Sequence, residues 1–504
     1  MRAEASPFFF FNLFMALSLA ILYSTVTNMA GIYIASELGG SPEISVYSMV
    51  FFGLGNVLTI PLTQLLADRI GVIRLLVYGL LLYTLFSFLC SLAPTFLIFN
   101  IFRFCLGLSS GIFFVLCRRI LLTFSPPEKV ESLSFLMLLS YTLLPILGVS
   151  FGAWLAYESF WRWIFYVNEL ISLPLAAYFW IFFRHTDQKT PHPFTDKLGY
   201  FFFVLGIGSI VTGLTVAQEV DWLASSTFIM LMLIGITSFI FFILWELNHP
   251  TPLIDLRLFK NPLLSFSLLN LAVLFSSYFG IIILISLWLN IYVNYTPLWI
   301  ALLIGIMAIA GIVAFLIRKF FLHSFDPRYT LAFAILCMAL SCYYSTYFNV
   351  EVDFFHLAVA RFLSGLGLVL FIYPLLHLSL LSHPKERSHE IYGLFQLTRA
   401  LFSSLGAALY VILWQRRQEF FHERLGEGLN VYSQITSEYF QRAVERFNLT
   451  SAQATSQLDV FLNQHSTSLA LNDVFGFMGY VLVVLFIILL LSFTKKKIHS
   501  LINP

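Results

Sequence analysis

The stretch "RFCLGL", residues 103 to 108, returns as "RFLSGL", residues 361 to 366, at an offset of 258 (361 minus 103). The same offset pairs further identical or similar residues: Asp68 with Asp326, Pro126 with Pro384, Glu128 with Glu386, Lys129 with Arg387, and Gly148 with Gly406. One match could arise by chance, but several at a single offset indicate an internal repeat. The sequence therefore predicts two related halves.

The composition is that of a membrane protein. Of the 504 residues, 59% are hydrophobic and 56 are Phe, and the mean hydropathy is +0.87, well above the usual range for soluble domains. Apolar runs of about 18 to 25 residues recur along the chain, each long enough to cross the ~30 Å hydrocarbon layer as a helix. We predict an all-α integral membrane protein with about fourteen transmembrane helices. Three of the spans expected as single helices are 8–35, 45–66 and 391–414.

The repeat predicts how these helices are organised. The offset covers about eight spans, an even number, so both copies enter the bilayer in the same direction and form parallel repeats. We predict an N-terminal six-helix bundle over residues 1–183 and an inserted helix pair with cytoplasmic linkers over 184–262. A C-terminal six-helix bundle would follow over 263–504. It contains a polar extracytoplasmic loop at about 415–471, with amphipathic stretches such as "SEYFQRAVERF".

Charge and cysteine placement narrow the location and the chemistry. Lys and Arg gather in alternate short loops, which predicts that both termini lie in the cytoplasm and that the protein is a multi-pass protein of the cell membrane. The five cysteines lie in apolar segments without CxxC spacing, and the eleven histidines show no metal-binding spacing. No nucleophile and base cluster together. We expect no enzyme, no metal, no cofactor and no nucleic-acid partner.

Several motifs carry a family resemblance. They are "LADRIGVIR" at 66–74, "RFCLGL", "LLPILGVSFGAWL" at 143–155, "WRWIFYVN" at 161–168 and "DLRLF" at 255–259. With these motifs the chain resembles the fourteen-span drug/proton antiporters of the major facilitator superfamily, the EmrB/QacA type. The resemblance implies the major facilitator fold, with two six-helix bundles plus two inserted helices.

The resemblance also implies a function. It predicts a secondary active transporter in the bacterial inner membrane that exports amphipathic small molecules by alternating access, with the proton gradient as its energy source. Pumps of the EmrB type work with a periplasmic adaptor and an outer-membrane channel, so the 415–471 loop is a candidate docking site for such an adaptor, the alternative being a self-folded cap without a partner. The other partners expected are the lipid bilayer and the small-molecule substrate. One alternative is a transporter of a metabolite or siderophore that is not proton-coupled or that imports. A remote alternative is a receptor or sensor on the same scaffold.

A cytoplasmic gate is predicted between spans two and three. A carboxylate at a helix end can accept bonds from N–H groups or from an arginine, and a glycine permits a tight turn. The resemblance implies that this motif bonds the two sides of the gate. The gate residues are Asp68, Arg69, Gly71, Arg74 and, in the second half, Asp326. The alternative is a plain basic loop.

Arginines are expected inside the bundle. A guanidinium within a span is costly unless it meets a partner or a water-filled cavity, so Arg103 should face inward. The resemblance implies a role in proton coupling or substrate contact, with Arg361 as the counterpart in the second half. The alternative is a structural bond to a backbone carbonyl or a neighbouring helix. Arg399 is expected to line the cavity, where neutral or anionic cargo is at least as consistent with these charges as a cation.

Spans one and five depart from the family pattern. The family usually carries an Asp in span one, where this chain has Tyr23, followed by Asn28 in the same segment. A phenol keeps its proton near neutral pH, so another acid must carry any coupled proton. We predict Glu169 for that role, the alternative being a solvated or structurally paired carboxylate. The helix-bending motif of span five keeps Pro145, Gly148 and Gly152.

Overall fold

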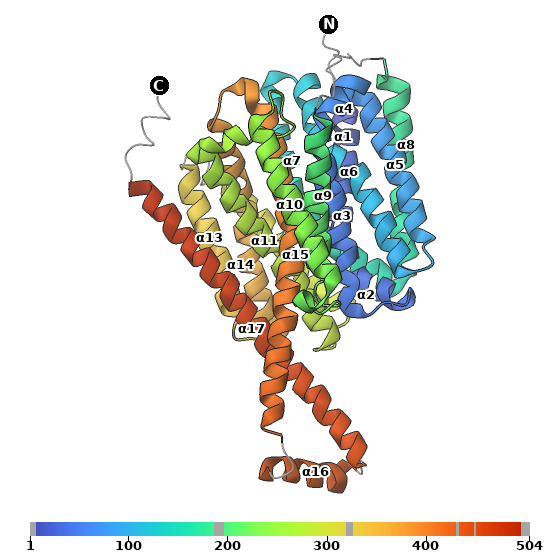
Figure 1. Cartoon of the computed structure of the whole chain (residues 1–504), viewed down its shortest axis with the longest axis vertical. Helices are drawn as coiled ribbons and strands as arrows, with labels where there is room; N and C mark the ends of the chain where they lie inside the picture. The colour runs from blue at the N-terminus through green and yellow to red at the C-terminus, as the bar shows by residue number, and fades with distance from the viewer. Residues whose placement is uncertain (1–6, 186–195, 319–325, 430–432, 448–449, 495–504) are drawn as a thin grey trace.

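The structure is a computed structural model that describes residues 7–185, 196–318, 326–429, 433–447 and 450–494. All of its regular elements in these ranges are helices (Figure 1). The first half contains α1 (Pro7–Tyr23), α2 (Thr27–Glu37), η1 (Pro42–Val46), α3 (Tyr47–Thr59), α4 (Leu62–Ile70), α5 (Val72–Ser91), α6 (Phe96–Phe124), α7 (Pro127–Glu158) and α8 (Arg162–Phe183). The inserted pair is α9 (Lys197–Val216) and α10 (Ser226–Asn248). The second half contains η3 (Leu256–Lys260), α11 (Pro262–Ile291), α12 (Pro297–Ile317), α13 (Pro327–Ser345), α14 (Phe354–Leu381), η5 (Lys385–Arg387), α15 (Ser388–Glu427), α16 (Gln434–Phe447) and α17 (Ser451–Thr494).

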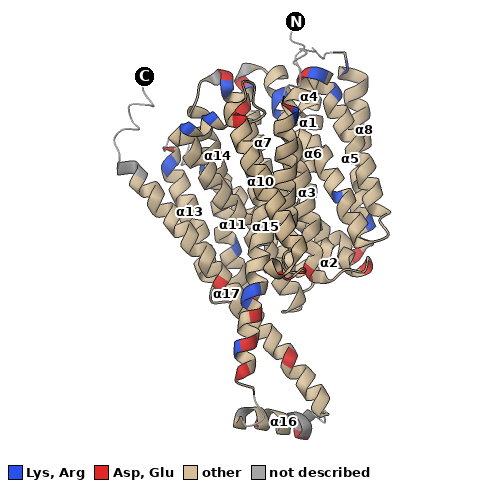
Figure 2. Cartoon of the chain, in the orientation of Figure 1, with Lys and Arg blue, Asp and Glu red and all other residues tan. Residues whose placement is uncertain are grey.

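The helices confirm the predicted membrane protein. Eleven helices among the described residues are long and apolar enough to cross a bilayer, and two bent helix pairs raise this to 13. The helix α13 has 19 residues and packs among them on α14 and α17. Charged side chains lie mainly at the two ends of the bundle, which leaves a nearly uncharged band between them (Figure 2). We call the end where α1 begins and α17 ends the terminal face, and the opposite end the hairpin face.

The first two spans are broken, whereas the sequence predicted single helices over 8–35 and 45–66. The helices α1 and α2 are bent by 54°, and the η1–α3 segment and α4 by 56°. At the first break the hydroxyl groups of Ser24 and Thr25 bind carbonyls of the preceding turn, and such bonds compete with the helical pattern. At the second break Pro61 lacks the N–H that would continue the helix.

The two halves meet along two helix pairs. The helix α7 packs on α12, and α3 packs on α15. At the second pair Gly53 allows close approach, because a Cβ at this position would lie 1.8 Å from the Ser404 Oγ. The inserted helix α9 contacts both α3 and α15, so the inserted pair lies along the seam between the halves (Figure 1).

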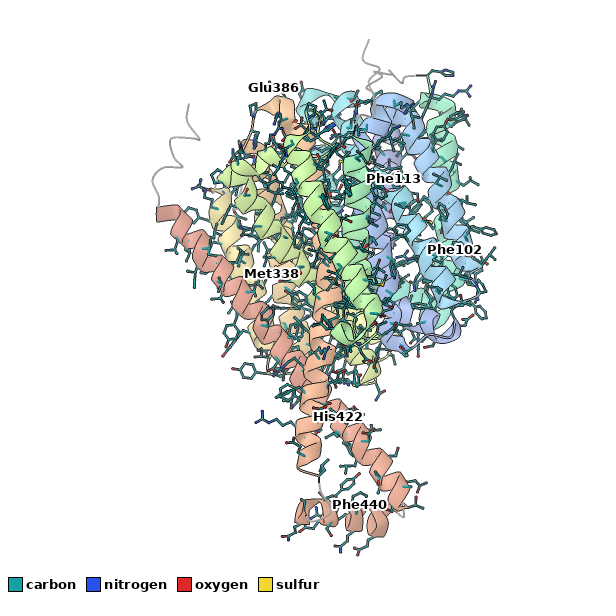
Figure 3. The ribbon with its side chains drawn as sticks, viewed as in Figure 1. Phe102, Phe113, Met338, Glu386, His422 and Phe440 are labelled. Atoms are coloured by element: carbon teal, nitrogen blue, oxygen red, sulfur yellow. The ribbon has the colours of Figure 1, made fainter. Side chains whose placement is uncertain are left out.

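The segment at 415–471 differs from the predicted loop. The helix α15 continues to Glu427, and α17 begins at Ser451, so the two helices extend past the bundle as a hairpin with α16 at its tip (Figure 1). His422 and Phe440 lie in this hairpin, outside the bundle (Figure 3). Its base is held by a bond from Trp414 Nε1 to the Thr467 carbonyl at 3.0 Å. The polar composition indicated exposure to water, and the segment is largely helical as well as polar.

Candidate functional site

A small cavity lies between the two halves. The first half contributes Ser24, Asn56 and Phe114 to its lining, and the second half contributes Phe279, Arg399 and Ser403. The volume of about 20 Å³ is room for roughly one water molecule. The cavity must therefore enlarge before it can hold a small organic molecule.

Arg399 places a positive charge beside this cavity. The residue is 5% exposed, and its guanidinium donates through Nε to the Gln396 Oε1 at 2.8 Å. The guanidinium carbon lies 4.6 Å from the ring centre of Phe114 and 4.7 Å from that of Tyr141, both in the first half. None of the ion pairs among the described residues includes Arg399. Aromatic rings hold this cation in place, and no described carboxylate neutralises it.

Arg103 lies inside the first half, not in the cavity lining. Its terminal nitrogen donates to the Tyr23 carbonyl at 3.0 Å and to the Thr27 hydroxyl at 3.2 Å, and its Nε donates to the Ser48 carbonyl at 3.3 Å. Because α1 ends at Tyr23, the carbonyl of Tyr23 lacks a helical partner, and the Arg103 guanidinium caps the end of α1. These bonds are of the kind expected if Arg103 has a structural role, binding backbone carbonyls and a neighbouring helix. A role in coupling stays a prediction.

Tyr23, Glu169 and Asn28 also lie in the first half. The Tyr23 hydroxyl donates to the Ile164 carbonyl of α8, and Arg103 and Glu169 both lie close enough to this phenol to act on it electrostatically. The Glu169 carboxyl is half-buried, and its Oε1 has no hydrogen-bond partner among the residues that the structure describes. The buried amide of Asn28 likewise has no partner among them. The structure thus brings Tyr23, Arg103 and Glu169 together, beside the cavity residue Ser24 but outside the cavity.

Arg361 occupies the corresponding place in the second half. It is fully buried, donates to the Ser345 hydroxyl at 2.6 Å and lies 5.3 Å from the ring centre of Phe475. Like Arg103, it is enclosed within its own half. Of the three predicted arginines, Arg399 alone is in the cavity lining.

The span-five motif in α7 packs against the break between α1 and α2. The Thr25 hydroxyl donates to the Pro145 carbonyl at 2.6 Å. A Cβ at Gly148 would lie 2.4 Å from the Leu22 carbonyl oxygen, and one at Gly152 would lie 1.9 Å from that of Val26. The glycines therefore let the broken backbone approach α7, which runs unbroken past Pro145.

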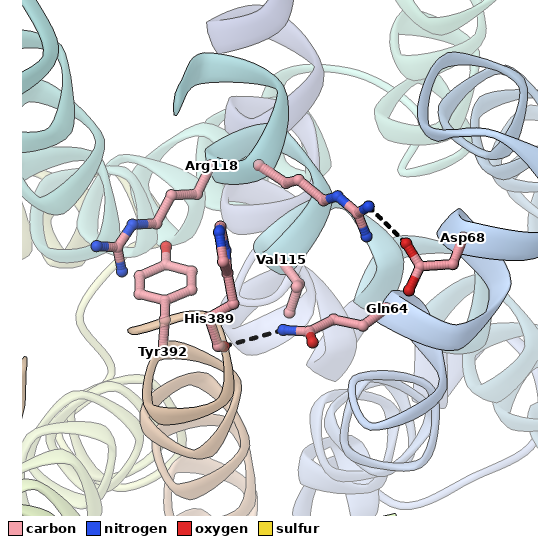
Figure 4. A pocket seen from close by; sticks show the side chains of 7 residues that line it. Gln64, Asp68, Val115, Arg118, His389 and Tyr392 are labelled. Carbon is pink, nitrogen blue, oxygen red and sulfur yellow. Dashed lines mark hydrogen bonds and ion pairs between the residues drawn. The ribbon is translucent and has the colours of Figure 1, made fainter. Parts of the chain in front are cut away.

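At the terminal face, the predicted gate motif forms contacts within the first half. Asp68 pairs with Arg119 of α6 at 2.5 Å (Figure 4). Gly71 has φ +108°, a conformation that favours glycine, and it connects α4 to α5. Arg69 is exposed and Arg74 is half-buried. In this structure the motif connects helices of the first half to one another, and its role in gating stays a prediction.

Other residues join the halves at this face, around a pocket of about 220 Å³ (Figure 4). The Gln64 amide donates to the His389 carbonyl at 2.9 Å. The Arg118 guanidinium lies 3.9 Å from the ring centre of Tyr392, and the hydroxyls of Tyr392 and Tyr141 are 3.2 Å apart. These contacts close the terminal face. Sequence reasoning missed them, although the paired arginines in "CRRIL", 117–121, within a predicted span were a usable signal.

Asp326 caps a helix in the second half. Its carboxylate accepts a bond from the Arg328 N–H at 2.9 Å, at the start of α13. The nearby contact between the halves comes from Arg318, whose guanidinium lies 4.6 Å from the ring centre of Phe135 in α7 and 3.4 Å from that of Tyr373 in α14. Arg318 therefore supplies a second connection between the halves at the terminal face.

The hairpin face is closed as well. The Tyr292 hydroxyl, just after α11, donates to the Glu43 carboxylate of η1 at 3.4 Å. Burial, together with the nearby Glu43 charge, raises the pKa of Tyr292 to about 12, so the phenol keeps its proton and remains a donor. With contacts between the halves at both ends, the structure is an occluded form.

Comparison with known proteins supports this architecture. A family model described as Major Facilitator Superfamily matches residues 13–407. Among curated proteins, the chain is 28% identical over 482 residues to the multidrug export protein EmrB of Haemophilus influenzae, which covers 94% of each chain. It is 27% identical over 490 residues to the fatty acid resistance protein FarB of Neisseria gonorrhoeae, which covers 97% of this chain and 96% of that one. A solved POT family transporter in complex with 5-aminolevulinic acid shares the fold, with a TM-score of 0.63 at 14% identity over 98% and 99% of the chains.

Proposed function

Because the chain belongs to the Major Facilitator Superfamily, we propose that it is a secondary active exporter of amphipathic small molecules, driven by the proton gradient across a bacterial inner membrane. The family consists of transporters rather than enzymes. Relatives over nearly the full length of the chain are named for multidrug export and for fatty acid resistance, which supports export as the direction.

The observation that carries the proposal is the charge of the cavity between the halves. Arg399 supplies a cation among the rings of Phe114, Tyr141 and Phe275, and the lining contains no carboxylate. An amphipathic acid would place its carboxylate on the guanidinium and its apolar part against the rings. An organic cation would meet repulsion there. We therefore propose amphipathic acids as the preferred cargo.

Alternating access would use the two closed faces in turn. We place the termini in the cytoplasm, so the contacts of Arg118 and Tyr392 form the inner gate and the Tyr292–Glu43 bond belongs to the outer gate. Cargo would enter when the inner contacts separate and leave when the outer contacts separate.

For the coupling proton we propose Glu169. Its free carboxyl oxygen lies near Tyr23, and the next residue, Ser24, lines the cavity. Binding of a proton at Glu169 would change the field on Tyr23 and so act on the broken segment of the first span. The rival interpretation is a transporter without proton coupling, which is favoured by Tyr23 at the family's carboxylate position.

Transport in reconstituted vesicles separates these possibilities. We would compare a medium-chain fatty acid, a neutral amphiphile and a lipophilic cation under an imposed pH gradient, using the wild type, Glu169→Gln and the exposed control Glu351→Gln. Gradient-driven transport that prefers the acid, and that Glu169→Gln alone abolishes, is the expected result. Transport that ignores the gradient in all three proteins would replace the proposal with the uncoupled transporter.

We also propose that the hairpin of α15, α16 and α17 docks a periplasmic adaptor that leads to an outer-membrane channel. The hairpin projects from the bundle (Figure 3). It exposes large apolar side chains at Phe420, Val460 and Phe461, between 41% and 51% accessible. Apolar groups exposed outside the bilayer favour contact with another protein.

A further inference from the structure

Two carboxyl groups are buried at the terminal-face end of the inserted helix pair. Asp196 precedes α9 as its N-cap, and Glu246 lies in the last turn of α10. Their side chains are only 4% and 1% exposed. Neither residue lines the cavity between the halves or takes part in the proposed transport mechanism.

Each carboxyl group uses one oxygen and leaves the other free. Asp196 Oδ1 accepts bonds from the Gly199 N–H and from Trp245 Nε1, both at 2.8 Å, whereas its Oδ2 has no hydrogen-bond partner among the described residues. Glu246 Oε2 accepts from the Ile254 N–H at 3.3 Å, whereas its Oε1 has no such partner in the described part of the chain. A buried carboxyl oxygen without a partner is costly, so each of these two oxygens requires a further hydrogen bond.

The two free oxygens lie near one another. A Cβ at Gly199 would lie 2.2 Å from Asp196 Oδ2 and 2.7 Å from Glu246 Oε1, so both oxygens lie around the same point in space. The two side chains are within hydrogen-bonding reach. Two ionised carboxylates are acceptors only and repel, whereas one added proton converts the contact into an O–H···O bond.

We propose that Asp196 and Glu246 bind one proton between them, taken up from the terminal face, and form a proton-binding site in the inserted helix pair. The proton is held by one carboxyl oxygen and donated to the other, so the pair carries a single negative charge. This proposal does not rest on the exporter function.

The surrounding charges do not neutralise the pair. On α9 the neighbouring Lys197 is exposed, and just after α10 the His249 ring stacks against Trp245. From η3, Arg257 donates to the carbonyls of Leu247 and His249 rather than to either carboxyl group. Within the described residues, these basic groups bind elsewhere or face water, which leaves a proton as the group that satisfies both oxygens.

The site also holds the segment that leads into the second half. Glu246 binds the N–H of Ile254, and the next residue, Asp255, pairs with Arg387 at 3.1 Å. Further along, the Asn261 amide donates to the Ser382 carbonyl at 2.5 Å. Loss of the shared proton would push the carboxylates apart and loosen this segment, so the site links proton binding to the contact between the inserted pair and the second half.

Infrared difference spectroscopy of the purified full-length protein tests the proposal. We would record the carbonyl band of protonated carboxyl groups across a pH series for the wild type, Asp196→Asn, Glu246→Gln and the exposed control Glu351→Gln. The expected result is a component of this band that shifts in D₂O and disappears as the pH rises, present in the wild type and the control and missing from both pair variants, whereas any component from Glu169 stays in all four proteins. A wild-type spectrum without such a component, or pair variants that both keep the full wild-type band, would overturn the proposal.

A thermal unfolding series gives a second readout. The folded protein holds a proton that the unfolded chain releases, so the wild-type unfolding midpoint should fall as the pH rises through the loss of that proton. Glu246→Gln supplies an amide donor to Asp196 at every pH and should remove this dependence while the protein stays folded. Equal pH dependence in the wild type and Glu246→Gln would contradict the shared proton.

Discussion

Replacing Tyr392 is expected to shift the protein toward a form that is open at the terminal face. The Tyr392 hydroxyl pairs with that of Tyr141 at 3.2 Å, and its ring lies 3.9 Å from the Arg118 guanidinium. Tyr392 belongs to α15 in the second half, and both partners belong to α6 and α7 in the first. These contacts exist only while the two halves are closed at this face.

The size of the shift follows from what each substitution removes. Tyr392→Phe removes one hydrogen bond and keeps the ring, which costs the closed form about 1 kcal/mol, or roughly a fivefold change in the ratio of open to closed protein. Tyr392→Ala also removes the cation–π contact, which is worth about 1 to 2 kcal/mol at a buried site. The combined loss of about 2 to 3 kcal/mol corresponds to a shift of roughly 30- to 150-fold.

Pulsed electron spin resonance would measure this ratio directly. Spin labels at Glu128 and Glu386, which are exposed repeat partners, report the separation of the halves at the terminal face, where Figure 3 shows Glu386. The long-distance population should rise from the wild type to Tyr392→Phe and again to Tyr392→Ala. The matched control is Tyr410→Phe, because Tyr410 lies in the same helix and pairs with Ser277 of its own half. Unchanged distances in both Tyr392 variants, or an equal shift in the control, would refute the reasoning.

Three further outcomes are expected. Arg399→Gln should weaken binding of an amphipathic acid by about 10- to 100-fold and change that of a neutral amphiphile little, as measured by ligand titration of purified protein; equal losses for both ligands would contradict the charge argument. Gly152→Ala should destabilise the fold by about 1 to 3 kcal/mol, since its Cβ would lie 1.9 Å from the Val26 carbonyl oxygen, whereas Gly208→Ala, with open space around it, should be neutral or stabilising in thermal unfolding. Phe461→Ser should leave vesicle transport intact and reduce resistance in cells that contain the adaptor; unchanged resistance would argue against docking on the hairpin.

The membrane class and the two-half organisation were already readable from the sequence. Hydropathy over a span-length window is a local property, and the recurrence of the Arg103 motif at Arg361 is visible without any coordinates. Local reasoning also identified the turn at Gly71, because a positive φ favours glycine. It reached its limit at the breaks near Ser24 and Pro61, where an apolar run shows that a segment crosses the bilayer but not whether it does so as one straight helix.

The sequence by itself determined that the chain is a membrane-spanning bundle built from two related halves, because length, hydropathy and repetition are properties of the linear chain. The tertiary structure alone decided which charged residues meet. Arg399 reaches the seam between the halves while Arg103 caps a broken helix within its own half, and Asp196 meets Glu246 from a different helix. Those outcomes depend on the rotation of each helix and on its neighbours, and an apolar span that is hydrophobic on every side contains little information about either.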